Sequence, residues 1–274
     1  MTQKLYNYSR LCLHTMTTKP WSLEEAIDGY TKAGIPGITV WRNHLEPYGA
    51  KEAGKRLRES GLHVVSLCRC GFFPAAGAQA RQDARDENKR IIDEAAEIGA
   101  PLVVLVCGAV PGIPLPDARQ HITDGIAAVL PHAESAGVRL AIEALHPMYA
   151  DDRSAVNTLE QANNMVTILA SPWLGVCVDV YHVWWDPMLK SEISRAGQKI
   201  FAFHVSDWRT PTRHLLNDRG MMGEGCINIP LIRGWVEDAG FQGFIEVELF
   251  SDQFWAWDQS ALVERIQQSY LTAV

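Results

Sequence analysis

The chain has 274 residues, of which 47% are hydrophobic and 21% are charged. A chain of this length and composition buries a sizeable core, which excludes a disordered protein and leaves one large α/β barrel or two small domains. The formal net charge of −7 argues against a protein whose whole surface binds DNA or anionic membranes. No stretch approaches about eighteen uninterrupted apolar residues and the first ten residues do not form a secretory signal, so we expect neither a membrane helix nor export.

The cysteine pattern predicts reduced thiols in a cytoplasmic protein. The six cysteines are scattered along the chain without a C-x-x-C pair, and most of them lie inside apolar runs. A thiol in such a run behaves as a small hydrophobic side chain. These cysteines are Cys12, Cys68, Cys70, Cys107, Cys177 and Cys226.

Eight short apolar runs, taken in chain order, predict eight strands. They cover residues 5–13, 37–40, 64–67, 102–106, 139–143, 174–179, 200–205 and 244–249. Runs such as LVVLV and VCVDV are rich in β-branched residues and nearly continuous, as strands buried on both faces are.

Segments with polar faces and helical spacing lie between these runs. Residues 22–33, 51–60 and 82–98 are the clearest predicted helices. Ser22 followed by Glu25 fits a capping box at the start of the first of them. Each repeat ends its helix at a glycine shortly before the next strand. The glycines in these positions are Gly34, Gly61, Gly99, Gly137 and Gly240.

Eight repeats of strand and helix with short connections predict a single (β/α)8 TIM barrel. The alternative is a doubly wound open sheet, which normally has a glycine-rich phosphate turn after an early strand, and the sequence contains none. No linker or break in composition marks a second domain, so we expect residues 1–274 to form one barrel domain.

Polar residues lie at the carboxyl ends of the last four predicted strands, which is where the active site of such a barrel lies. They are Glu143 and His146, Asp179 and His182, His204, Asp207 and Arg209, and Glu246 and Glu248. A buried carboxylate is costly unless it is paired or binds a metal ion, so four strand ends of this kind predict a divalent cation. Three carboxylates and one imidazole favour Mn²⁺ or Mg²⁺, with Co²⁺ or Zn²⁺ as alternatives. The competing interpretation is that each group caps a helix or pairs with an arginine.

This arrangement resembles the sugar phosphate isomerase/epimerase family of the xylose isomerase-like TIM barrel superfamily, which also contains the endonuclease IV-type nucleases. The resemblance covers nearly the whole chain and is strongest in VCVDVYHVWWDP, FHVSDWR, GEGCINIP and GFIEVELF. It implies four metal ligands, namely Glu143, Asp179, His204 and Glu248. It also implies that His182 and Arg209 contact the substrate. Glu246 is the alternative to Glu248, because the two point to the same face of one strand.

The resemblance implies a metal-dependent isomerase or epimerase that acts on a ketose or keto-sugar through an enediolate. Glu143 and Glu248 would then serve as the acid/base pair while the metal polarises the substrate. His146 is a further candidate for the general base. Trp185 is a candidate to stack on a sugar face, since tryptophans follow the strands that carry site residues.

Two other activities compete with this prediction. A lyase (dehydratase, decarboxylase or deglycosylating enzyme) would use the same metal-stabilised enolate to expel a leaving group from a keto-sugar derivative. A DNA-repair nuclease needs extra metal-binding histidines and a basic surface, which the net charge of −7 disfavours. The absence of a Lys/Arg cluster at the strand ends favours an unphosphorylated small-molecule substrate. Exposed aromatic residues would suit subunit contacts in a homo-oligomer.

Several residues near the first three strands have no role that the sequence decides. His14, His44 and His63 are more simply explained as satisfied or exposed histidines. Arg69 and Phe72 follow the third predicted strand, and the sequence does not settle whether they line the pocket.

Overall fold

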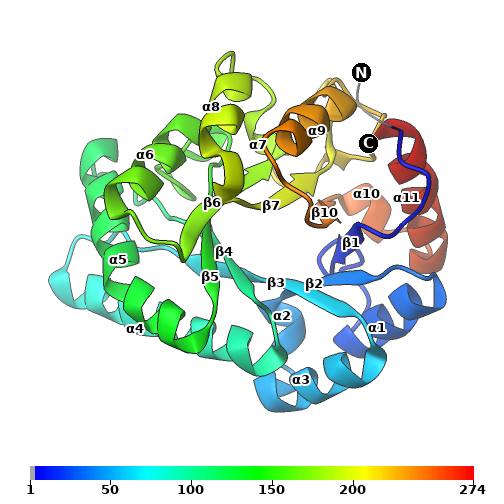
Figure 1. The fold of residues 1–274 in the computed structure, drawn as a ribbon, viewed down its shortest axis with the longest axis horizontal. Coiled ribbons are helices and arrows are strands. Elements are labelled where there is room, and N and C mark those ends of the chain that lie inside the picture. Colours follow the sequence, from blue (N-terminus) through cyan, green and yellow to red (C-terminus); the bar gives the residue numbers. More distant parts are fainter. Residues whose placement is uncertain (1–3) are drawn as a thin grey trace.

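Eight parallel strands close into a barrel in the computed structural model, which describes residues 4–274 (Figure 1). The strands follow one another around the barrel in the order β1-β10-β7-β6-β5-β4-β3-β2, and β2 pairs with β1. They are β1 (Leu11–His14), β2 (Gly37–Trp41), β3 (His63–Gly71), β4 (Leu102–Val106), β5 (Arg139–Glu143), β6 (Leu174–Asp179), β7 (Ile200–Val205) and β10 (Ile245–Val247). The closed parallel sheet confirms the predicted (β/α)8 barrel and rules out the open doubly wound sheet.

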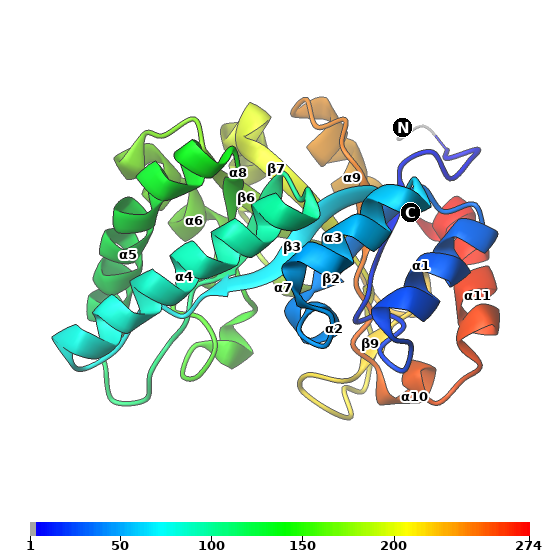
Figure 2. The same cartoon turned by 90° about the horizontal axis from the view of Figure 1, so that it is seen from below.

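The longer helices form a ring outside this barrel (Figure 1). They are α1 (Leu23–Lys32), α3 (Gly49–Ser60), α4 (Ala78–Ile98), α5 (Leu115–Ala136), α6 (Leu159–Leu169), α8 (Leu189–Ala196), α9 (Ile229–Asp238) and α11 (Gln259–Ala273). Short elements lie in the connections, namely α2 (Arg42–Leu45), η1 (Pro147–Tyr149), α7 (Val180–Val183), η2 (Gly197–Lys199), β8 (Asp207–Trp208), β9 (Arg219–Gly220) and α10 (Asp252–Trp255). Figure 2 shows α2, α10 and β9 together at one end of the barrel.

Local signals in the sequence explain where these helices begin and end. The predicted capping box is present, because the Ser22 hydroxyl accepts the Glu25 N–H while the Glu25 carboxylate accepts the Ser22 N–H. Gly61, Gly99 and Gly137 end their helices in the left-handed conformation, which costs glycine little. The predicted helix at 82–98 starts four residues earlier, at Ala78.

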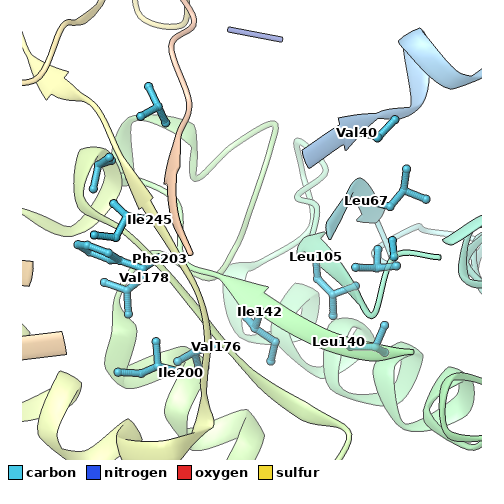
Figure 3. Packing of buried hydrophobic residues seen from close by; sticks show 14 of the residues in the cluster. Val40, Leu67, Leu105, Leu140, Ile142, Val176, Val178, Ile200, Phe203 and Ile245 are labelled. Atoms are coloured by element: carbon cyan, nitrogen blue, oxygen red, sulfur yellow. The ribbon is translucent and has the colours of Figure 1, made fainter. Parts of the chain in front are cut away.

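Alternation along the strands separates the core from the barrel interior, because successive side chains point to opposite faces. Leu140 and Ile142 of β5 and Val176 and Val178 of β6 pack into the large core between sheet and helices (Figure 3). A separate buried cluster fills the interior with residues from the alternate positions. Its members are Cys68, Leu102, Val104, Ala141, Cys177 and Ala202. Polar residues at interior positions of the same strands therefore face one another inside the barrel.

Four strands depart from their predicted bounds, β2 only by the addition of Trp41. The run at 5–13 pairs only from Leu11 onward, and Tyr6 is 76% exposed. β3 continues to Gly71 because it keeps pairing with β4 through an irregularity between Cys68 and Cys70. The run at 244–249 forms only Ile245–Val247, since the backbone N–H of Leu249 turns away to the Thr17 hydroxyl.

Five of the six cysteines are buried, Cys226 is exposed, and all six are free thiols. This matches their expected behaviour as small core side chains. Within residues 4–274, none of the helices has both the length and the apolar character that crossing a bilayer requires.

Candidate active site at the carboxyl ends of the strands

Four buried side chains from consecutive barrel strands converge at the carboxyl end of the barrel. Glu143 ends β5, Asp179 ends β6, His204 lies in β7 and Glu248 directly follows β10. One ligand atom from each lies within 4.8 Å of the others. All four occupy interior positions of their strands, so period-two alternation brings them together.

His204 lies among the carboxylates of this group. Its Nδ1 is 3.3 Å from Glu143 Oε1 and 3.8 Å from Glu248 Oε2. Neither ring nitrogen makes a hydrogen bond of acceptable geometry, although the side chain is fully buried. Buried polar atoms without a partner are uncommon in proteins and call for an explanation such as a bound ion. The imidazole and the three carboxylates form a donor set that suits a divalent cation.

Asp179 is fixed in two directions. Its Oδ1 accepts the Tyr181 N–H at 2.8 Å, which caps α7, and its Oδ2 accepts Arg219 Nη1 at 3.0 Å. Burial raises the pKa of Asp179 to about 7, even though Arg219 opposes this shift. A cation at this position would favour the ionised form of the carboxyl group.

Arg219, from β9, connects the acidic group to His182. Its Nη1 also donates to Glu248 Oε2 at 2.7 Å, and its Nη2 lies 3.0 Å from His182 Nε2. Burial raises the pKa of Glu248, but Arg219 and His14 outweigh it and hold that pKa well below its usual value. Burial and the Arg219 charge together lower the pKa of His182. Glu248 is therefore anionic and His182 neutral.

Glu246 occupies a second layer, deeper in the barrel than Glu248. Its Oε2 accepts the Thr39 hydroxyl at 2.6 Å and the Ser66 hydroxyl at 3.3 Å, and it is 3.3 Å from His14 Nε2. These partners satisfy its charge within the barrel. The geometry thus groups Glu248, and not Glu246, with Glu143, Asp179 and His204.

A cavity of about 540 Å³ opens above this group. Glu143, His182, Arg219 and Glu248 are among the residues that line it. Aromatic side chains line the wall, namely Trp41, Phe72, Tyr149 and Phe250. A concave, largely apolar cavity with a few convergent polar groups has the character of a small-molecule site.

A family model described as a xylose isomerase-like TIM barrel matches residues 27–270 of this chain. The chain belongs to this family. The membership agrees with the resemblance carried by the strand-end motifs, and the match runs from within α1 to within α11.

Individual relatives extend over the whole barrel. Inosose isomerase of Bacillus velezensis is 25% identical over 264 residues, which are 90% of each chain. The crystal structure of protein SMc04130 from Sinorhizobium meliloti 1021 is 46% identical, with a TM-score of 0.95, and the alignment covers 97% of this chain and 99% of that one. The crystal structure of the IOLI protein with a bound zinc atom has the same fold, with a TM-score of 0.84, 21% identity, and coverage of 97% of this chain and 98% of that one.

Three predicted residues of this xylose isomerase-like barrel lie outside the cavity wall. Arg209 donates to Gln253 and Glu224 and packs on the Phe254 ring, so its charge is already neutralised away from the acidic group. His146 and Trp185 contact each other, with ring centroids 5.7 Å apart, in the loops behind His182. These positions argue against the predicted substrate contacts of Arg209 and Trp185 and against His146 as the general base.

Sequence reasoning missed Arg219 and gave His14 no role. His14 lies at the end of β1 between Glu246 and Glu248, at 3.3 Å from each. Its position at a predicted strand end was the only signal in the sequence. Arg219 lies far beyond the end of β7, in the long connection to α9, so only the folding of this connection brings it to the site.

Asp207 anchors the loop that carries Arg219. Its two carboxylate oxygens accept four backbone N–H groups at 2.8–3.0 Å, from Trp208, Gly223, Gly225 and Ile227. We expect Asp207→Ala to lower the free energy of unfolding by about 3 kcal/mol, because four charge-assisted hydrogen bonds are lost and the buried N–H of Ile227 remains unpaired. Urea denaturation measures this change. The matched variant Asp252→Ala removes a surface carboxylate and should cost about 0.5 kcal/mol or less; equal losses would contradict the anchoring role.

The two arginines of this region should differ in their effect on stability. In metal-free protein, Arg219→Ala leaves Asp179 and Glu248 buried without their cation, and we expect a loss of about 3 kcal/mol. Arg209→Ala breaks contacts nearer the surface and should cost about 1 kcal/mol. Thermal unfolding of both variants after chelation compares them. A larger loss in Arg209→Ala would mean that Arg219 does not hold the acidic group together.

Proposed function

We propose that the protein is a divalent-metal-dependent enzyme that isomerises or epimerises a ketose or keto-sugar. The observation that carries this proposal is the convergence of Glu143, Asp179, His204 and Glu248 within 4.8 Å below a cavity of about 540 Å³. The inosose isomerase relative supports a sugar-like ketone as the substrate class.

The four residues fit a divalent ion by their chemistry. Three carboxylates and one imidazole are predominantly hard donors, which favours Mn²⁺ or Mg²⁺, while the zinc atom of the IOLI protein keeps Zn²⁺ among the candidates and Co²⁺ remains an alternative. The unpartnered ring nitrogens of His204 support its assignment as a ligand. The chemistry supplied by a bound ion is Lewis-acid polarisation of the substrate carbonyl.

The two glutamates that line the cavity, Glu143 and Glu248, would transfer the proton. They reach the cavity from β5 and from the end of β10, which are separated by β6 and β7 around the barrel. A carboxylate on one side of the substrate removes the proton next to the carbonyl, and the carboxyl group on the other side returns one. Glu248 is assigned as the base because it lines the cavity and is ionised beside Arg219 and His14, so it can accept a proton.

His182 and Arg219 would hold substrate oxygens above this pair. Both line the cavity, and Arg219 donates to Glu248 and Asp179 from the same side. His182 Nε2 accepts Arg219 Nη2 and so orients the guanidinium, whose N–H groups would stabilise the negative charge that develops on the substrate oxygen as the proton leaves. His146 and the tryptophans near it, which favoured a lyase in the sequence, do not line the cavity. Their positions therefore give the lyase no support over the isomerase.

Proton NMR in D₂O tests this proposal. We expect the Mg²⁺- or Zn²⁺-loaded enzyme to introduce deuterium next to the carbonyl of an inosose or ketose without changing the carbon skeleton. Loss of water, carbon dioxide or an aglycone would overturn the isomerase in favour of a lyase. No exchange on any keto-sugar by enzyme with bound metal would overturn both activities.

A further inference from the structure

Two arginines outside the acidic group line the same cavity. Arg69 belongs to β3, and Arg153 follows η1 in the loop after β5. Both share this wall with Glu143, Glu248 and His182. Folding therefore brings two guanidinium groups from distant parts of the chain to the place where the substrate is expected.

The other two arginines of the cavity are already paired with carboxylates. Arg219 contacts Asp179 and Glu248 at 3.0 and 2.7 Å, and Arg42 Nε contacts Glu94 at 2.9 Å. These ion pairs balance the charge of both side chains, so neither Arg219 nor Arg42 is an unneutralised cation in the cavity wall.

Arg69 and Arg153 have no comparable partners. Across residues 4–274 no carboxylate lies within ion-pair distance of Arg69, whose guanidinium instead lies over the rings of Phe72 and Trp41 at 4.4 and 6.0 Å. Arg153 lies 4.0 Å from the solvent-exposed carboxylate of Asp152, where screening by water leaves little interaction. Two half-buried cations thus face the cavity largely unneutralised.

The two side chains also repel each other. Burial lowers the pKa of Arg69 and the nearby charge of Arg153 lowers it further, and these effects outweigh the opposite effect of Glu143 and Glu248. The carboxylates of the acidic group do not need these charges, because a divalent ion and Arg219 together balance Glu143, Asp179 and Glu248. An anion between the two guanidinium groups would relieve the repulsion.

We propose that the substrate carries a carboxylate or phosphate group that binds between Arg69 and Arg153. This inference rests on the proposed function, since it assumes that the reacting carbonyl lies over Glu143 and Glu248. Guanidinium groups bind both anions through paired N–H donors. The aromatic wall leaves the remaining carbon chain an apolar surface to lie against. The substrate class is therefore an acidic or phosphorylated keto-sugar, contrary to the unphosphorylated sugar expected from the sequence.

A matched set of ketoses tests this proposal. D-Fructose, D-fructuronate and D-fructose 6-phosphate share a keto end and differ in the group at the other end. Calorimetric titration of metal-loaded enzyme should show at least about tenfold tighter binding of one anionic member than of fructose, as expected for charge-assisted hydrogen bonds. Preference for fructuronate identifies a carboxylate substrate, and preference for fructose 6-phosphate identifies a phosphate. Equal affinity for all three overturns the proposal.

Arginine variants test whether the anion binds between Arg69 and Arg153 or at the metal ion. In Arg69→Gln/Arg153→Gln the preference should fall by at least about tenfold, whereas Arg42→Gln, which removes a paired arginine of the same wall, should keep it. A preference that survives in the double variant overturns the proposal. Proton exchange on the same compounds distinguishes failure of the proposed isomerase activity from failure of the proposed anion site. Arginine-dependent binding without exchange would refute only the isomerase, and equal exchange and binding for neutral and anionic ketoses would refute only the anion site.

Discussion

Glu248→Gln should lower the rate of α-proton exchange by about 10³-fold. The amide keeps the size of the side chain but removes the negative charge that Arg219 and His14 hold at the cavity, so both the base and a metal-binding oxygen are lost. Exchange of substrate protons with D₂O, followed by NMR on enzyme saturated with metal, measures this loss.

Glu246→Gln is the matched control, because it makes the same change two residues away on the same strand face. Glu246 does not line the cavity and is held by Thr39, Ser66 and His14. We expect exchange to fall less than about tenfold and the main effect to be a loss of stability of about 1–3 kcal/mol. If Glu246→Gln instead abolished exchange and Glu248→Gln preserved it, the assignment of the two glutamates would be reversed.

A divalent ion should stabilise the folded protein through the same four residues. At a free ion concentration about 100 times the dissociation constant, the expected gain in unfolding free energy is about 2.7 kcal/mol. Thermal unfolding with Mn²⁺, Mg²⁺, Zn²⁺ or Co²⁺ measures it, and a chelator should reverse it.

His204→Gln provides the control for this stabilisation. The variant loses the imidazole whose nitrogens have no hydrogen-bond partner, and it should show little or no gain with any of these ions. An undiminished gain in His204→Gln would place the stabilising ion elsewhere in the protein.

Sequence periodicity was sufficient to predict the central strands of the barrel. β4, β5, β6 and β7 begin and end where the apolar runs do, because a strand buried on both faces consists of continuous β-branched residues bounded by turns. β1 was predicted too long, since apolar residues before Leu11 pack without joining the sheet. The end of β10 depends on a single side-chain acceptor, the Thr17 hydroxyl, which no local pattern reveals.

The candidate site likewise contains residues that the sequence could predict and residues that it could not. Strand ends and period-two alternation predict that Glu143, Asp179 and His204 point into the barrel, and that Glu246 and Glu248 share one face; only the family resemblance preferred Glu248 over Glu246. Arg219 could not be predicted, since its position depends on a loop organised by Asp207 through backbone contacts. Arg69 lies in β3 and Arg153 in the loop after β5, so the two do not form a basic cluster in the sequence.

Anomalous diffraction from crystals grown with Mn²⁺ tests the central claim most directly. The account predicts one strong peak within bonding distance of Glu143, Asp179, His204 and Glu248, at the floor of the cavity. A peak among His14, His204 and Glu246, deeper in the barrel, would contradict it, because an ion there would not reach a substrate in the cavity.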